Sequence, residues 1–467
     1  MNFAFYDLET TGTSPAFDQP LQFAAILTDG EFREIERVNL RCRIAPHIIP
    51  SPWALAVTGV RPAQLVDPAF PTLFEFMQEI GALIERWSPA IWTGFNSIRF
   101  DEEMLRQAFY QNLQPDIFAT QFNGNTRFDI LTALYAVWHR QPELFEWPVD
   151  PDGRVRFKLD RIAPLNGFAA HNAHDALCDV EATIHIARQI AQRAPGLWAE
   201  LLANRDKAHV QASLATFQPM ALVERFGGGL PRATIGCFCG TSASNPNQVA
   251  FFDLDAADPT DLLTADDAAV FAAVDATPKV IRAFSVNKTP ALLSVAAPSA
   301  EQLRRAEMIA HAPEFRARVG RALAARFPED LAAPTPPVEK QIYGGFYSHA
   351  DKALLAEFQG ANWPRRQEIV ATLADPRLRQ LGRRLVAFHA PELLSAEERG
   401  QYQTWLRERW SAPDVPETEW TTKDRALAAL TEMQGDEEVD PRLVSEVAAY
   451  LQGFDVARLI RVAKSFA

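Results

Sequence analysis

Cysteine is scarce in this sequence, and none of it is arranged to bind zinc. The chain of 467 residues has four cysteines, Cys42, Cys178, Cys237 and Cys239, with no C-x-x-C pair among them. So few thiols argue against a disulfide framework and are typical of a protein in a reducing compartment. We therefore expect reduced thiols and a cytoplasmic location.

Apolar runs long enough to cross a bilayer are also missing. No stretch approaches the roughly 20 apolar residues that a membrane-spanning helix needs. The first residues lack the basic region of a signal peptide and carry Asp7 and Glu9 where such a peptide is apolar. The sequence thus predicts no contact with a membrane.

Positive charge is in deficit. The chain carries 46 Lys and Arg against 59 Asp and Glu, a net charge of −13. Residues 1–190 alone hold 15 basic and 24 acidic side chains. This balance argues against a general nucleic-acid coat, although a local basic groove is sufficient to bind a polyanion. A bound metal would offset part of the acid excess at the start of the chain.

The order of apolar and polar residues predicts an α/β segment with a mixed sheet at the start of the chain. The expected elements are strands over 3–9, 22–28, 37–44 and 90–96, a loop over 50–62, and helices over 72–87 and 101–112. Asp7 and Glu9, two residues apart, point to the same face of the first strand. Their charges repel, and a divalent cation such as Mg²⁺ or Mn²⁺ would offset them. Two solvated acids on an edge strand are the alternative.

Two later segments carry further candidates. Asp101 opens a predicted helix, a position that suits either a site residue or a simple helix cap. His174 precedes, and Asp179 lies inside, a helix predicted to run to about residue 194. The two converge if His174 lies on the loop before that helix. Ala176 and Ala182 would let the helix pack close to the first strand.

Together these residues match the requirements of two-metal phosphodiester hydrolysis. The expected metal ligands are Asp7, Glu9, Asp101 and Asp179. Carboxylates from several elements hold two ions roughly 3.5–4 Å apart, one activating water and the other stabilising the departing 3′ oxygen. His174 would take the proton of the water, because histidine titrates near neutral pH.

The rest of the chain has a pattern of short strands first and a mostly helical pattern after it. Short β-like runs over 221–223, 234–238, 248–252 and 280–286 predict a small barrel or twisted sheet, with helices over 300–311 and 313–327. Residues 332–337 are the best linker candidate. Further helices are predicted over 348–359, 365–374, 375–388, 395–410 and 442–466. Two arginine clusters are candidates for phosphate or acidic-peptide contacts, namely Arg316, Arg318, Arg321 and Arg326, and Arg377, Arg379, Arg383 and Arg384.

The order D-x-E, N-x-x-x-F-D and H-x-A-x-x-D resembles the DEDDh branch of the 3′–5′ exonucleases over residues 1–190. Segments 6–10, 22–26, 94–101 and 172–176 are similar to the bacterial exonuclease I family, and 286–290 and 343–348 extend the resemblance along nearly the whole chain. It implies an α/β, ribonuclease-H-like exonuclease domain with a mixed sheet at 1–192. A small Src-homology-like β-barrel domain at 195–340 and an all-α domain at 343–467 would complete a C-shaped clamp around single-stranded DNA.

The resemblance also implies an activity and partners. The family hydrolyses single-stranded DNA from the 3′ end with two Mg²⁺ ions, for which Mn²⁺ is a possible substitute. It releases 5′-mononucleotides in DNA repair and recombination, with Asp7, Glu9, Asp101 and Asp179 as metal ligands and His174 as general base. The implied partner is the acidic C-terminal tail of single-stranded-DNA-binding protein, and a monomer is sufficient for the clamp.

Substrate contacts are expected from Glu9, Thr10, Phe95, Asn96 and Lys158. Lys158 stands where a relative has arginine, so a point charge replaces a bidentate fork. A channel lined with aromatic rings would admit one strand and exclude a duplex, with Phe95, Phe100 and Trp53 as candidate stacking residues.

Two rival functions are kept. A DEDDh ribonuclease or proofreading exonuclease shares these motifs, but it is usually little more than the catalytic domain. A non-catalytic single-strand-binding adaptor would predict the loss of a carboxylate, and none is lost.

Overall fold

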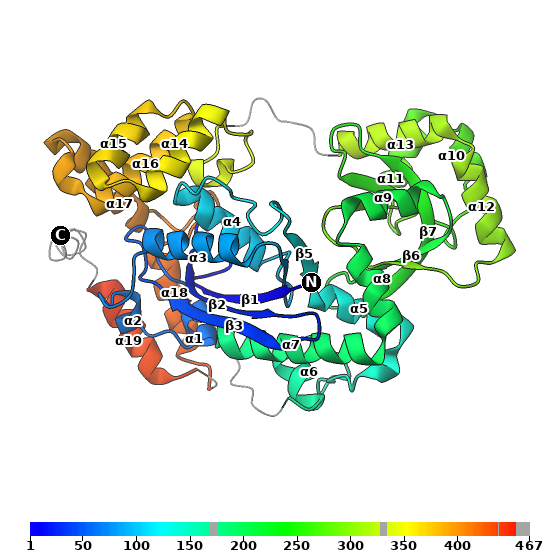
Figure 1. The fold of residues 1–467 in the computed structure, drawn as a ribbon, viewed down its shortest axis with the longest axis horizontal. Helices are drawn as coiled ribbons and strands as arrows, with labels where there is room; N and C mark the ends of the chain where they lie inside the picture. The colour runs from blue at the N-terminus through cyan, green and yellow to red at the C-terminus, as the bar shows by residue number, and fades with distance from the viewer. Residues whose placement is uncertain (169–174, 327–333, 438, 454–467) are drawn as a thin grey trace.

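The computed structural model describes residues 1–168, 175–326, 334–437 and 439–453. Along the chain it forms a first sheet region (3–193), a second sheet region (195–325) and a set of C-terminal helices (338–452). In Figure 1 the second sheet region and the helices α14 to α16 stand on opposite sides of helix α4 of the first region.

The first sheet is mixed, as predicted. Its order is β3-β2-β1-β4-β5, in which β1 pairs antiparallel with β2 and parallel with β4. The strands are β1 (Phe3–Thr10), β2 (Pro20–Thr28), β3 (Glu34–Arg41), β4 (Ile91–Gly94) and β5 (Thr126–Asp129). The helices are α1 (Pro52–Thr58), α2 (Pro62–Leu65), α3 (Leu73–Trp87), α4 (Asp101–Gln111), α5 (Ile130–Arg140), η1 (Pro142–Leu144), α6 (Leu159–Leu165) and α7 (Ala176–Arg193).

Two local predictions in this region were wrong. Strand β3 begins and ends three residues earlier than the predicted strand over 37–44. The predicted loop over 50–62 contains helix α1 and the start of α2. Helix α1 forms because the side chain of Ser51 accepts a hydrogen bond from the Ala54 amide, and because Pro52 occupies the first turn, where its missing N–H costs nothing.

The two faces of β1 lie in different cores. Ala4, Tyr6 and Leu8 pack into a core that includes side chains of α3 and α4, whereas Phe3 and Phe5 pack into one that includes side chains of α7. Because strand side chains alternate, Asp7 and Glu9 continue the Phe3 and Phe5 face, on the side of α7. Helix α7 packs on β1 and β2, with Ala176 and Ala182 fully buried, so it approaches the strand closely as predicted.

The second sheet has the order β10-β6-β7-β8-β9, with every pair antiparallel. Among the described strands no pairing joins its edges β9 and β10, so a closed barrel is not confirmed and the twisted-sheet alternative fits. The strands are β6 (Met220–Glu224), β7 (Arg232–Thr241), β8 (Gln248–Asp253), β9 (Ile281–Ser285) and β10 (Leu292–Ser294). The helices are α8 (Pro195–Ala203), α9 (Lys207–Ala215), α10 (Thr260–Thr264), α11 (Asp267–Asp275), α12 (Ala300–Ala310) and α13 (Pro313–Ala325).

The described part beyond residue 337 is helical, as predicted. Its elements are η2 (Val338–Gln341), α14 (His349–Gly360), α15 (Trp363–Thr372), α16 (Pro376–His389), η3 (Pro391–Leu393), α17 (Ala396–Trp410), α18 (Lys423–Met433) and α19 (Pro441–Gln452). Helix α18 was not predicted. The part of the predicted helix 442–466 beyond residue 453, and residues 332–333 of the predicted linker, lie outside the described residues.

The three parts of the chain share their cores. Phe74 of α3 meets Phe358 of α14 edge to face at 5.8 Å, and the Tyr110 hydroxyl donates to the carbonyl of Val338 at 2.8 Å. The core on the other face of the first sheet takes in Val223 and Leu293 from the second sheet. The division into domains at 1–192, 195–340 and 343–467 stays a prediction.

The cysteines of the chain are not paired with one another. All four cysteines are free thiols, and Cys42, Cys237 and Cys239 are buried. No helix in the described ranges combines the length and the apolar character needed to cross a membrane.

Candidate metal centre

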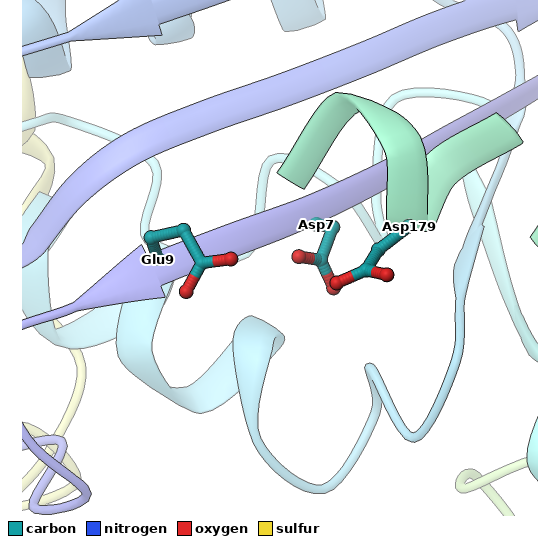
Figure 2. Close-up of side chains that lie close together, drawn as sticks. All are labelled: Asp7, Glu9 and Asp179. Carbon is teal, nitrogen blue, oxygen red and sulfur yellow. The ribbon is translucent and has the colours of Figure 1, made fainter. Parts of the chain in front are cut away.

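Three carboxylates converge at the end of β1. Asp7 and Glu9 project from the strand and Asp179 from the first turns of α7, and one oxygen of each lies within 4.8 Å of the others. Figure 2 shows the Asp7 and Asp179 carboxylates facing each other, with Glu9 further along the strand. A set of three carboxylate oxygens from two elements is suited to a hard divalent cation.

The start of α7 fixes the position of Asp179. The Asp175 side chain caps the helix by accepting from the Leu177 amide at 3.1 Å. Asp175 also forms an ion pair with Arg41 of β3 at 3.4 Å, which ties the first turn to the sheet. Asp179 lies one turn further on and reaches the strand carboxylates. His174, the predicted general base, lies outside the described residues.

Asp101 lies beside this group but is not one of the three. Its side chain is 4% exposed, and its Oδ1 accepts a hydrogen bond at 3.1 Å from the amide of Leu8, between Asp7 and Glu9. The difference has a structural cause, because α4 packs on the opposite face of the sheet from α7. Asp101 therefore reaches the site at the strand backbone, and one of its oxygens is already engaged.

The site brings acidic side chains near one another, with Glu9 and Asp101 buried and Asp7 and Asp179 partly exposed. Burial raises the pKa of Asp7 well above its ordinary value, and the charges of Asp101, Glu9 and Asp179 raise it further. Burial, followed by the charges of Asp179 and Asp101, raises the pKa of Glu9 to about 8. The pKa of Asp101 is raised to about 7, again mainly by burial. A bound divalent cation would reverse these shifts, because it favours the ionised carboxylates.

The turn after Glu9 is held by hydrogen bonds. The Thr10 side chain is buried, and its hydroxyl donates to the carbonyl of Gly12 at 2.7 Å. Asp18 accepts from the Thr11 hydroxyl and from the Ser14 amide, both at 2.9 Å. A Cβ on Gly12 would lie 2.5 Å from Asp18 Oδ2, so only glycine fits at this close approach.

Sequence reasoning missed Asp129, which holds the loop between β4 and α4. Asp129 ends β5, is 4% exposed, and accepts from the amides of Asn96 at 3.3 Å and Ile98 at 3.2 Å. It also caps α5 through the Thr132 amide. Asn96 has a left-handed backbone, with φ of 66°. An acid between a short strand and an apolar helix, where it can cap the helix, was the available signal.

The other predicted substrate residues are spread around the site. Lys158 is exposed and precedes α6. Phe95 and Phe100 are half-buried and pack against the two cores of the first sheet, so part of each side chain is already in contact with other apolar residues. Trp53 is 38% exposed on α1.

The two arginine clusters are largely used inside the protein. Most of their guanidinium groups hold acids or backbone carbonyls: Arg316 with Ile309 and Ala310, Arg318 with Leu263, Arg321 with Asp267, Arg326 with Asp275, Arg377 with Asp375, Arg379 with Leu373 and Ala374, and Arg384 with Glu339. These contacts weaken the sequence-based assignment of both clusters to an external polyanion.

A cavity of about 1040 Å³ lies elsewhere, between the first sheet region and the C-terminal helices. Arg43, His47, Phe74, His389 and Tyr450 are among its lining residues, and none of the site carboxylates is. This cavity is therefore separate from the carboxylate site.

Comparisons with known proteins match two parts of the chain to exonuclease families. An exonuclease family model matches residues 4–187, and a model of the exonuclease I C-terminal domain matches residues 336–454. Exodeoxyribonuclease I of Escherichia coli strain K12 is 30% identical over 433 residues, which cover 87% of this chain and 89% of the relative.

Solved structures match the whole chain. Escherichia coli exonuclease I in complex with a dA16 oligonucleotide superposes with a TM-score of 0.80 at 28% identity, over 98% of this chain and 99% of that one. A structure of SSB/Exonuclease I in complex with the inhibitor CFAM gives a TM-score of 0.79 at 28% identity, over 97% and 99%. These matches confirm the predicted ribonuclease-H-like α/β exonuclease fold followed by a C-terminal helical region. The chain belongs to the exodeoxyribonuclease I family.

Proposed function

We propose that this chain hydrolyses single-stranded DNA from its 3′ end and releases 5′-mononucleotides. The observation that carries the proposal is the convergence of Asp7, Glu9 and Asp179 beside buried Asp101, in a member of the exodeoxyribonuclease I family. A solved relative holds a single-stranded dA16 oligonucleotide. A binding adaptor would have no use for four acidic side chains gathered at one strand end, two of them buried.

The donor set fits two Mg²⁺ ions. Asp7, Glu9 and Asp179 would hold them, joined by the Asp101 oxygen that does not accept from Leu8. All of these ligands are carboxylate oxygens, which Mg²⁺ prefers and Mn²⁺ also accepts. When bound, the ions supply Lewis-acid activation of water and stabilise charge on the departing 3′ oxygen. The protein contributes the fixed positions of the carboxylates and their burial.

His174 is our candidate for the general base, on the strength of the sequence. Its neighbour Asp175 caps α7 one turn before Asp179, so the chain enters the helix beside the carboxylates. His174→Gln should lower kcat by roughly 10²–10⁴-fold and flatten the acidic limb of the pH–rate profile. A variant that keeps the wild-type profile would contradict this role.

The substrate contacts follow from the same surface. Glu9 and Thr10 would meet the terminal nucleotide, with Phe95 and Asn96 beside it on the loop that Asp129 holds. Lys158 is exposed, and no acidic side chain among the described residues pairs with it, so its ammonium is available to a phosphate. A point charge of this kind attracts the backbone without reading sequence.

A digestion assay tests the activity. Oligonucleotides labelled at either end would be offered as single-stranded DNA, blunt duplex and RNA of one sequence, with Mg²⁺. We expect 5′-mononucleotides from single-stranded DNA only, and a loss of roughly 10³-fold or more in Asp7→Ala. Asp261→Ala changes an exposed acid in the second sheet region and should match the wild type. Equal digestion of RNA or duplex would overturn the substrate, and activity in EDTA would overturn the metal.

The proposal also includes a binding partner, a cellular location and a process. We propose that the protein acts in the cytoplasm as a monomer in DNA repair and recombination, and binds the acidic C-terminal tail of single-stranded-DNA-binding protein. Support comes from the related SSB/Exonuclease I structure. Fluorescence anisotropy with a labelled tail peptide tests the contact, and a peptide with its acids replaced by amides is the control. Equal binding of both peptides would contradict recognition by charge.

A further inference from the structure

Exposed aromatic side chains lie on two segments near helix α4, Phe122 on one of them and Tyr343 and Phe346 on the other. Phe346 is 95% exposed, Tyr343 57% and Phe122 53%. Phe118 links two of them, because its ring lies 5.7 Å from Phe122 and stacks with Tyr343 at 6.4 Å. We call Phe118, Phe122, Tyr343 and Phe346 the aromatic platform. Large rings left in water and gathered on one surface indicate an interaction site.

The platform is bonded to helix α4, which begins at Asp101. The Tyr343 hydroxyl donates to Glu103 Oε2 at 2.5 Å. Glu103 lies in the first turn of α4, two residues after Asp101, which itself accepts from the Leu8 amide on β1. Two helical residues rise only about 3 Å along the axis. The partner of Tyr343 therefore lies within one helical turn of Asp101, although Tyr343 is far from Asp101 in the sequence.

Hydrogen bonds from Arg377 fix the backbone of the segment that carries Tyr343 and Phe346. Arg377 of α16 donates to the carbonyls of Gln341 at 2.8 Å and Gly345 at 3.1 Å, which anchors the turn on both sides of Tyr343. Gly345 has φ of 125°, a conformation that favours glycine and that directs the chain into exposed Phe346. The Arg106 guanidinium covers the Phe118 ring at 4.7 Å. Such anchoring presents the rings at little cost in conformational entropy on binding.

The chemistry around the platform selects one class of occupant. In the neighbouring turn Glu102 is paired with Arg106 and Arg127, and Glu103 with Arg106, so this surface offers a ligand ring faces and no free charge from these groups. We propose that bases of the single strand, upstream of the 3′ nucleotide, stack on Phe346 and its neighbours. This inference rests on the proposed function and extends it. Bases in a duplex have no free face to offer, so the platform also favours single strands.

Substitutions at Phe346 test the proposal without disturbing the fold, because the side chain is almost fully exposed. Phe346→Ala and Phe346→Leu should each raise KM for a single-stranded oligonucleotide about tenfold with kcat unchanged, and Phe346→Trp should restore it. An oligonucleotide with abasic sites upstream of the 3′ end should bind the wild type and Phe346→Ala equally. Leu303→Ala removes a side chain on α12 that is 42% exposed, and should change nothing.

The outcomes separate this inference from the proposed function. An inactive wild type on single-stranded DNA would contradict the function. With an active wild type, an unchanged KM in Phe346→Ala overturns the platform alone. The platform is also overturned if Phe346→Ala binds normal and abasic oligonucleotides more weakly than the wild type by the same factor, or if the variant lowers kcat alone. Wild-type behaviour in Phe346→Leu would also overturn it, since leucine keeps the apolar bulk and removes the ring.

Discussion

Neutralising Glu9 should stabilise the metal-free protein while abolishing its activity. Burial and neighbouring carboxylates raise the pKa of Glu9 from 4.5 to about 8, so the folded state binds this proton more tightly than the unfolded state does. Stability without metal therefore falls as the pH rises from 4.5 to 8. Glu9→Gln carries no such penalty. Removing the Glu9 charge also lowers the pKa of Asp7, because that charge is one of the causes that raise it.

The magnitude follows from the pKa difference. The loss of folding free energy grows by about 1.36 kcal/mol for each pH unit above 4.5, the ordinary pKa of glutamate. It is therefore about 3 kcal/mol at pH 7 and about 2 kcal/mol at pH 6. An unfolding entropy of about 2.1 cal/mol/K per residue converts 3 kcal/mol into a rise in Tm of about 3 °C for the whole chain. The gain should vanish below pH 4, where Glu9 is protonated in both states.

Differential scanning calorimetry in EDTA, from pH 4 to pH 8, measures this effect. Glu102→Gln is the matched control, because Glu102 is also buried but shares its carboxylate with Arg106 and Arg127. Although burial raises the pKa of Glu102, its loss leaves two buried guanidinium groups without their shared acid, so Tm should fall. A lower Tm for Glu9→Gln at pH 7, or a gain independent of pH, would refute the reasoning.

Three further predictions concern the metal, the turn after β1 and the substrate backbone. Mg²⁺ at 100 times its Kd should stabilise the wild type by about 2.7 kcal/mol in calorimetry, and Asp179→Asn should lose most of this stabilisation. An equal stabilisation of the variant by Mg²⁺ would exclude Asp179 as a ligand. Gly12→Ala should destabilise by roughly 1–3 kcal/mol in chemical denaturation because its Cβ meets Asp18, whereas Gly228→Ala, in open space, should be neutral; equal costs would contradict the clash. Lys158→Ala should raise KM for every sequence and reduce the slope of log KM against log salt by about 0.7, with Lys158→Arg close to the wild type; an unchanged slope would mean that Lys158 meets no phosphate.

Local patterns were sufficient for the centre of the site. Alternation along a strand depends only on near neighbours, so the shared face of Asp7 and Glu9 could be predicted from β1 alone. The small side chains Ala176 and Ala182 indicated close packing of α7, and Asp179 lies at the strand end in consequence. Long helices with a clear apolar face were predicted to within about two residues for the same reason.

Contacts between distant segments could not be predicted in this way. The bond from the Leu8 amide to Asp101 spans 93 residues, and the bond from Tyr343 to Glu103 spans 240. No local pattern encodes either. Strand β10 has three residues, too few to show alternation. The arginine clusters looked free because their acids and carbonyls come from other turns and elements.

The shared cores bear on how this protein can be divided. Phe74 of α3 is enclosed by Phe358, Trp363 and the guanidinium of Arg366, all from the C-terminal helices. A fragment ending near residue 192 would leave this surface uncovered in water, where it favours aggregation. The nuclease region is therefore a recognisable unit of sequence without being an independent unit of folding. Deletions that remove the C-terminal helices should be interpreted as loss of the structure, and not as loss of specificity alone.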